Sequence, residues 1–529
     1  MDLLTSVFNL QVSLALLCIS VALYVWYFVE KKFSYWDKRG VPEISILTCL
    51  PNFIVQLLQI KRFSTIVSDY YKATEGHNFI GIYQGLRPAI MLRDPTMVND
   101  WIVKGFPNFH DRNSPPDEKA RNLSGNLLSL TGERWHIVRA KVSPAFSSVK
   151  LNFMYDANRS YSEEAKIHLE RLCSGKNEAI VDVDDFVNRY AMDVIGAWGL
   201  GGECNAMKDP QNCEIKKILD QFMRSSWRRS MELFLSMVHP NLARLFRSRC
   251  FSNISNFITS VTNQAIKTRH ENGSSGKDFL QYLINVCRAE TEGEHGQEEG
   301  ENMLNGVPQP SKNEDSVFTE NIVASTIVNM LAAGLHTVAA TTTFCLYELA
   351  YHPEIQDRVF KEIQTVKNGS GSEIQFADLK KFPYLTQVIS ETLRKHPPGG
   401  LMVRKCTETF NVPNSSIVIE KGVDLLIPTI GFHHDSRYFP NPENFDPERF
   451  SAENIDRIVP GSYLPFGEGP RFCIANRMAI MNVKDMLITI LSEYSLHPCS
   501  KTKNPLKFDR KTFTLSPEGE VWLCIKRRI

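Results

Sequence analysis

The stretch FGEGPRFCIA, residues 466–475, places one cysteine behind two glycines, a proline and an arginine, directly before an apolar helical pattern. Gly467 and Gly469 permit a tight turn and a close backbone approach. The N-terminus of a following helix, from Arg477 onward, stabilises a thiolate. Cys473 is therefore a candidate metal ligand. The alternatives are a buried inert thiol, the usual fate of a single cysteine, and a catalytic nucleophile, which needs a histidine base that the local sequence does not supply.

An uncharged run from Leu3 to Val29 is the second strong constraint. One helix of this length, at about 1.5 Å per residue, spans the roughly 30 Å hydrocarbon core of a bilayer. No polar face interrupts the run, which argues against a core helix. The run ends in aromatic residues that suit a membrane interface, namely Tyr24, Trp26 and Tyr27. The basic residues that follow favour a cytosolic main domain, and they are Lys31, Lys32, Lys38 and Arg39. We predict a membrane anchor at 1–30, a linker at 31–50 and one large domain at 51–529.

Composition excludes some classes of function. The chain has 529 residues, 43% of them hydrophobic and 22% charged, which is typical of a globular protein. Lys and Arg number 60 and Asp and Glu 59, so the net charge of +1 provides no field that would attract nucleic acid. The 12 cysteines form no CxxC or zinc-like cluster, which indicates a reducing compartment.

Hydrophobic patterning predicts strands at 79–85 and 88–94, followed by mainly helical sequence. The segment 290–315 is acidic and poor in apolar residues, so we expect a solvated loop. Residues 318–351 then predict one long helix ended by Pro353. The small residues Ala332, Ala333 and Gly334 at its midpoint would let a large group approach the backbone.

Two short motifs pair charged or aromatic residues on one helix face. In ETLR, Glu391 and Arg394 are three residues apart, and in WHIVR, Trp135 and Arg139 are four apart. Taken alone, the first is usually an exposed ion pair and the second an ordinary amphipathic helix.

Together these motifs resemble the cytochrome P-450 family. FGEGPRFCIA matches the haem loop F-x-x-G-x-R-x-C-x-[GA], and WHIVR, ETLR and FDPERF follow the family's order and spacing. The resemblance covers residues 135–475 with an anchor in front, and GPRFCIANRMAIMN is similar to insect microsomal members. It implies a mainly α, prism-shaped fold with a smaller β-rich part near the N-terminus. Haem b would lie between the long helix and the Cys473 loop.

The resemblance also implies roles for individual residues. Cys473 would be the iron ligand, and Glu391, Arg394 and Arg449 would form a buried charged triad that fixes the loop before it. Residues implied to bind or shape the haem site, several through its propionates, are Trp135, Arg139, Arg404, Arg471, Phe466, Gly467, Gly469 and Ala475. Ala475 stands where many members have glycine.

The long helix departs from the family pattern. The family usually shows [AG]-G-x-[DE]-T-[ST], whereas this chain has Gly334 and Thr337 with His336 in place of the acid. In the family, the acid and the alcohol help to deliver protons during oxygen activation. Histidine titrates near neutral pH and could serve as a relay, or it could be a helix-face histidine bonded to backbone or water.

The implied activity is insertion of one oxygen atom of O2 into lipophilic small molecules, such as insect hormones, plant toxins or insecticides. The implied partners are an NADPH-cytochrome reductase, a cytochrome b-type donor and the endoplasmic reticulum membrane, with the main domain in the cytosol. A haem-thiolate isomerase or dehydratase without reductase, and a non-catalytic haem-binding protein, stay open. Positions expected near the substrate are the segment after Asn108, residues 222–246 with Trp227 and Phe234, the start of the long helix, Leu401, Met402, Phe513 and Thr514.

Overall fold

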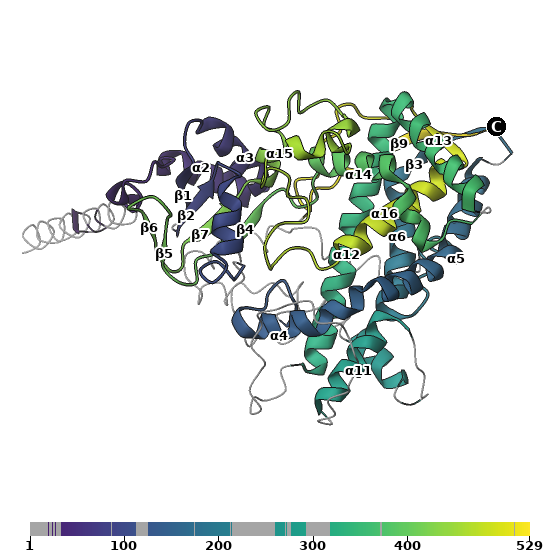
Figure 1. The fold of residues 1–529 in the computed structure, drawn as a ribbon, viewed down its shortest axis with the longest axis horizontal. Coiled ribbons are helices and arrows are strands. Elements are labelled where there is room, and N and C mark those ends of the chain that lie inside the picture. Colours follow the sequence, from purple (N-terminus) through teal and green to yellow (C-terminus); the bar gives the residue numbers. More distant parts are fainter. Residues whose placement is uncertain are drawn as a thin grey trace, which may run out of the picture.

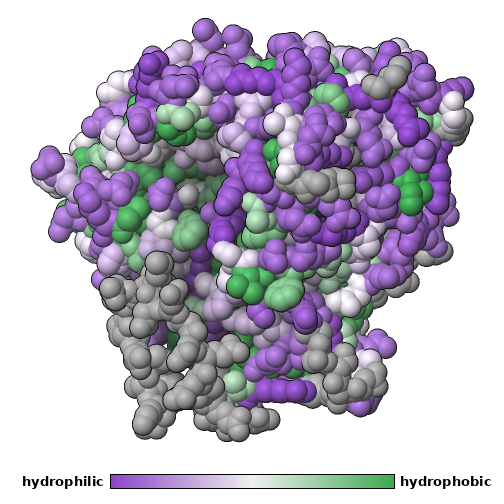
Figure 2. Space-filling view, turned by 45° about the vertical axis from the view of Figure 1, so that its right-hand side comes forward, coloured by the Kyte–Doolittle hydropathy of each residue, from purple (hydrophilic) through white to green (hydrophobic). Residues whose placement is uncertain are grey.

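The computed structural model of the chain describes residues 19, 20, 24, 27, 33–85, 87–112, 125–173, 175–211, 213, 260–269, 271, 277–291, 318–370, 373–512 and 514–528. Most of the predicted anchor at 1–30, most of the acidic segment at 290–315, residues 222–246 and Phe513 lie outside these ranges. A mainly helical part and a smaller β-rich part lie side by side (Figure 1), as the sequence predicts. Figure 2 shows a mainly hydrophilic surface with small hydrophobic patches.

The main described helices of the helical part and the sheet's surroundings are α2 Ile46–Leu57, α3 Phe63–Ala73, α4 Gly132–Val142, α5 Ser148–Cys173, α6 Val183–Leu200, α11 Phe279–Thr291, α12 Glu320–Tyr351, α13 Pro353–Ser370, α14 Pro383–Lys395, α15 Thr429–His433 and α16 Asn476–Leu491, with the π-helical turn Asn99–Lys104. The long helix predicted at 318–351 is α12, which begins two residues later and is followed directly by α13 at Pro353.

The helix α12 runs through the helical part and contacts α6 and α16 (Figure 1). Its apolar residues surround the helix on nearly every side, and such a helix is stable only when it is buried. It is the one helix among the described residues that is long and apolar enough to cross a membrane, but 72% of that apolar window is buried. Its packing therefore identifies α12 as the centre of a protein core.

Within the described ranges, nine strands form three sheets: β1 Phe79–Gln84, β2 Arg87–Leu92, β3 Glu178–Asp182, β4 Met402–Lys405, β5 Phe410–Asn411, β6 Val418–Ile419, β7 Asp424–Ile427, β8 Tyr494–Pro498 and β9 Trp522–Arg527. Their orders are β1-β2-β7-β4, β3-β9-β8 and β5-β6. The predicted strands at 79–85 and 88–94 are the antiparallel pair β1 and β2. The β-rich part is not only N-terminal, however, because β7 pairs in parallel with β2 and brings β4 with it.

Residues 33–50, part of the segment expected to be a linker, pack onto this sheet. Trp36 is fully buried and its Nε1 donates to the carbonyl oxygen of Ile82 at 3.1 Å. Val41 and Cys49 are also buried in the same cluster. Apolar side chains removed from water tie this segment to β1, so the folded domain begins before residue 51.

Gly81 makes room for the Trp36 ring. A Cβ atom at position 81 would lie 2.4 Å from Cγ of Trp36. We expect Gly81→Ala to lower the free energy of unfolding by about 1–3 kcal/mol, the usual effect of overpacking, as measured by urea-induced loss of ellipticity. In the control Gly369→Ala, nothing lies within 4 Å of the new Cβ, so the change should stay within about 0.5 kcal/mol. Equal stability of the two variants would contradict this role of Trp36.

Candidate functional site

The Cys473 loop is a closed turn directly before α16. Gly467 and Gly469 have φ of 76° and 71°, in the left-handed region that favours glycine. A Cβ on Gly469 would also lie 2.5 Å from the carbonyl oxygen of Ile102. The Cys473 amide donates to the carbonyl oxygen of Phe466 at 2.9 Å, which closes the turn. The loop therefore presents the cysteine side chain at the N-terminal end of a helix.

The charge state of Cys473 depends on its surroundings. Burial raises the pKa of the thiol, whereas a backbone hydrogen bond at Ala475 and the positive charges of Arg139 and Arg112 act to lower it. Burial is the largest of these effects, so the free thiol is favoured until a cation binds the sulfur. A coordinated metal ion deprotonates a thiol. The site therefore suits a metal-bound thiolate.

Four arginines gather near the thiol with little negative charge to balance them. Removal from water lowers the pKa of Arg139 to about 10 and the pKa of Arg404 and of Arg471 to about 9, and it also lowers the pKa of Arg112. Within the described part of the chain, only Arg471 forms an ion pair, with Asp111 at 3.1 Å. Buried cations require a counter-charge. The cluster therefore fits a ligand that carries carboxylates.

Arg471 is held mainly by the protein itself. Its guanidinium donates to the carbonyl oxygens of His110, Leu127 and Leu130 at 2.8–3.3 Å and to Asp111. These bonds use four of its five N–H groups. The guanidinium also lies 4.0 Å above the ring of Trp135, which is buried on α4. Arg471 and Trp135 thus form one packed unit.

Arg112 is a site residue that the sequence analysis did not identify. It donates to the carbonyl oxygen of Arg471 at 3.0 Å, and its charge acts on Cys473. Among the described residues, the Arg404 guanidinium, on β4, donates only to the carbonyl oxygen of its neighbour Val403, at 3.0 Å. Both guanidiniums keep N–H groups that the described residues do not engage. The segment around Arg112 carries no family motif, so only its position in space reveals it.

One face of α12 opens in the middle of the buried helix. Ala333 is exposed, and Gly334, His336 and Thr337 are partly exposed, whereas the adjoining turns are buried. The Thr337 hydroxyl donates to the carbonyl oxygen of Ala333 at 2.6 Å. Ala332, which was expected to join this open face, is only 4% exposed and packs in the core instead.

Glu391, Arg394 and Arg449 come together as a buried network. The two carboxylate oxygens of Glu391 accept from Arg394 at 2.7 and 2.8 Å, and both side chains are fully buried. Arg449 lies 3.4 Å from Glu391, which also accepts from the amide of Asp446 at 2.9 Å. Every strong donor or acceptor of the central pair thus has a partner, as a buried ion pair requires.

His433 connects this network to the thiol loop. Arg394 donates to the carbonyl oxygen of His433 at 2.9 Å, and the Leu464 amide donates to Nε2 of His433 at 2.8 Å. Since Nε2 accepts, the proton is on Nδ1, which lies 3.1 Å from the carbonyl oxygen of Arg394. Burial lowers the pKa of His433 to about 3, so the ring stays neutral and keeps this arrangement.

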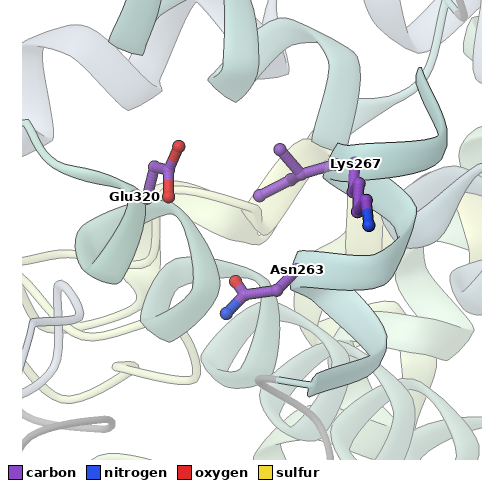
Figure 3. A pocket seen from close by; sticks show the side chains of 4 residues that line it. Asn263, Lys267 and Glu320 are labelled. Carbon is purple, nitrogen blue, oxygen red and sulfur yellow. The ribbon is translucent and has the colours of Figure 1, made fainter. Parts of the chain in front are cut away.

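A separate pocket of about 300 Å³ lies at the start of α12 (Figure 3). Asn263 and Lys267 line it from the helix at 260–269, and Glu320 lines it from α12. Thr337 lies about 25 Å from Glu320 along the helix, at 1.5 Å per residue. This pocket therefore belongs to a different region from the thiol. Of the other predicted substrate positions, Leu401, Met402 and Thr514 are described, and Met402 Cε lies 3.7 Å from the Cβ position of Gly467.

Comparison with known proteins agrees with this geometry. The family model for Cytochrome P450 matches residues 49–524. Cytochrome P450 6k1 of Blattella germanica is 34% identical over 498 residues, which cover 94% of this chain and 93% of the relative. Probable cytochrome P450 6a14 of Drosophila melanogaster is 32% identical over 513 residues, covering 94% and 96%. The resemblance seen in the sequence is confirmed: the chain belongs to the cytochrome P450 family of haem-dependent mono-oxygenases.

Proposed function

We propose that this chain inserts one oxygen atom of O2 into lipophilic small molecules, with electrons from NADPH delivered by a membrane-bound reductase. The observation that carries the proposal is the convergence of the Cys473 thiol, the unbalanced arginines and the open face of α12. This arrangement suits a dianionic haem with a thiolate ligand and a distal chamber. Insect hormones, plant toxins and insecticides are the proposed classes of substrate.

The residues present fit haem b. The Cys473 sulfur would ligate the iron, and the loop of Phe466, Gly467, Gly469 and Ala475 would hold it in place. Arg112, Arg139 and Arg404 would bind the propionates, because guanidinium forks match carboxylates. Trp135 and Arg471 would lie beside these three arginines. They would either donate hydrogen bonds to the propionates or hold the arginines in position. When bound, the iron supplies the activation of dioxygen.

On the opposite side, α12 would control protons and substrate access. Thr337 and His336 are both partly exposed on the open part of the helix, although the Nε2 atom of His336 is itself buried. A Cβ at Gly334 would make only an ordinary contact with the Ile195 side chain, at 3.4 Å. We propose that His336 passes protons from solvent toward Thr337. A histidine can carry out this role with a pH dependence that a carboxylate would not have.

We further propose that residues 1–30 anchor the chain in the endoplasmic reticulum membrane, with the catalytic domain in the cytosol. The uncharged run and the basic residues after it support this orientation. Reductase, and a cytochrome b-type donor as a second source of electrons, would then meet the domain on the cytosolic side.

The central test uses the full-length protein in microsomes with NADPH-cytochrome reductase. We expect the reduced protein with carbon monoxide to show the red-shifted Soret band of thiolate ligation. Cys473→Ala should abolish the band and Cys499→Ala should keep it, because only Cys473 lies in the haem loop. NADPH consumption across a panel of lipophilic compounds should require reductase. Turnover of an oxygenated substrate without reductase would favour an isomerase or dehydratase, and haem binding without any turnover would favour a binding protein.

Arg112 gives a second prediction. Loss of one charge-assisted hydrogen bond to a propionate costs about 1.5–3 kcal/mol. We therefore expect Arg112→Gln to accelerate haem transfer to apomyoglobin by about tenfold or more, with partial recovery in Arg112→Lys. Arg134→Gln is the matched control, because Arg134 is exposed on the neighbouring helix α4. Equal rates in the wild type and Arg112→Gln would remove Arg112 from the haem site.

His336 gives a third prediction. His336→Asp restores the family's acid next to Thr337 and should raise the ratio of product formed to NADPH consumed. The pH dependence of this ratio should flatten near neutral pH, because the titrating imidazole is gone. Hydrogen peroxide release and product yield between pH 6 and 8 measure both effects. Unchanged coupling and an unchanged pH profile would make His336 a structural residue.

A further inference from the structure

A groove of about 490 Å³ lies beside the thiol loop and includes Phe466 of that loop in its lining. Its apolar wall includes Leu151 of α5, Phe376 and Leu379 of the 3-10 helix Phe376–Lys381, and Ile480 of α16. No residue of α12 and none of the four site arginines lines it. The volume is within the range of about 300–1,000 Å³ that is typical of small-molecule sites.

Three cations line the same groove. They are Lys380, Arg477 and Lys484, and none of the described lining residues is acidic. Lys380 and Arg477 are exposed at the rim, and neither forms an ion pair with the described part of the chain. Arg477 donates instead to the Ser148 hydroxyl at 2.7 Å. The groove is thus apolar along its walls and positive at its edge.

Lys484 is the most informative of these cations because it is only 6% exposed. Its Nζ donates to the carbonyl oxygen of Leu379 at 2.7 Å, which uses one of three N–H groups. Glu362, whose charge acts on Lys484, accepts from the amides of Tyr384 and Leu385 at 2.8 and 2.9 Å. An ammonium group at this depth lacks a close counter-charge, which is costly unless an anion enters.

We propose that this groove binds a long-chain carboxylate, of the fatty-acid class, with its chain along the apolar wall and its head group between Lys484, Lys380 and Arg477. A single-chain head group can enter far enough to meet the buried Lys484 ammonium. A flat protein surface would meet only the two cations at the rim. The combination of depth, apolar walls and positive charge therefore selects a small amphipathic anion.

The acyl chain of the bound carboxylate would contact the loop that carries the thiol. Phe466 lines the groove, and its carbonyl oxygen accepts from the Cys473 amide at 2.9 Å. Occupancy of the groove would thus stabilise the loop in its closed form. By mass action, a ligand that binds only the folded protein raises its stability.

The test uses the full-length holoenzyme in nanodiscs, with laurate as the probe and dodecanol as its uncharged analogue. A saturating iron-ligating azole closes the haem chamber, so that calorimetry reports binding elsewhere, after subtraction of empty nanodiscs. We expect saturable laurate binding, at least about tenfold tighter than dodecanol, and a higher thermal midpoint with laurate. Lys380→Glu should weaken laurate about tenfold, which is about 1.4 kcal/mol. Lys421→Glu, an exposed turn residue away from the groove, should leave the affinity unchanged.

Ile480→Trp provides a second, charge-neutral variant that fills the groove and should also abolish laurate binding. Three results would overturn the proposal: no saturable binding with the azole present, equal affinity for laurate and dodecanol, or unchanged affinity in both Lys380→Glu and Ile480→Trp. A Lys380→Glu variant that slows electron transfer from reductase while keeping laurate affinity would assign the rim to a protein partner instead, and would also overturn it.

Discussion

The buried ion pair between Glu391 and Arg394 is the interaction on which the thiol loop depends. Both side chains are inaccessible to water, and breaking such a pair typically costs about 3–5 kcal/mol because a bare charge stays buried. Arg394 also donates hydrogen bonds to backbone carbonyl oxygens, including that of His433. His433 in turn accepts the amide proton of Leu464, two residues before Phe466. The pair therefore serves mainly to fix the position of the loop, and it adds less to the stability of the fold.

The arginine cluster shows a fold that is complete only with its cofactor. Arg139, Arg404 and Arg112 are drawn out of water without carboxylates from the described residues, and burial lowers the pKa of each. These unpaired buried charges raise the free energy of the folded state. Binding of a dianion would lower it again. If the haem propionates pair with these arginines, as proposed, haem binding would relieve this penalty and so raise the stability of the fold.

Local sequence was sufficient to predict those features that depend on residues close together in the chain. The turn at Gly467 and Gly469, the long helix and the strands β1 and β2 follow from short patterns, and the family motifs led to Glu391, Arg394 and Arg449. Contacts between distant segments were not visible. The parallel pairing of β2 with β7 and the packing of Trp36 against β1 depend on long-range burial. The resemblance placed the segment after Asn108 near the substrate, but Arg112 itself belongs to no motif, because its role arises from its position beside Arg471.

Thr337 shows why the residue at position 336 matters. The Thr337 hydroxyl has one proton, and that proton is committed to the carbonyl oxygen of Ala333 at 2.6 Å. In this conformation Thr337 can accept a hydrogen bond from the open face of α12 but cannot donate one. Such back-bonding of threonine also tends to bend a helix, and Thr341 repeats it against the carbonyl oxygen of Thr337 at 2.8 Å. A proton that reaches this face must therefore come from solvent or from a neighbouring side chain, and His336 is the titratable group adjacent to Thr337 in the sequence.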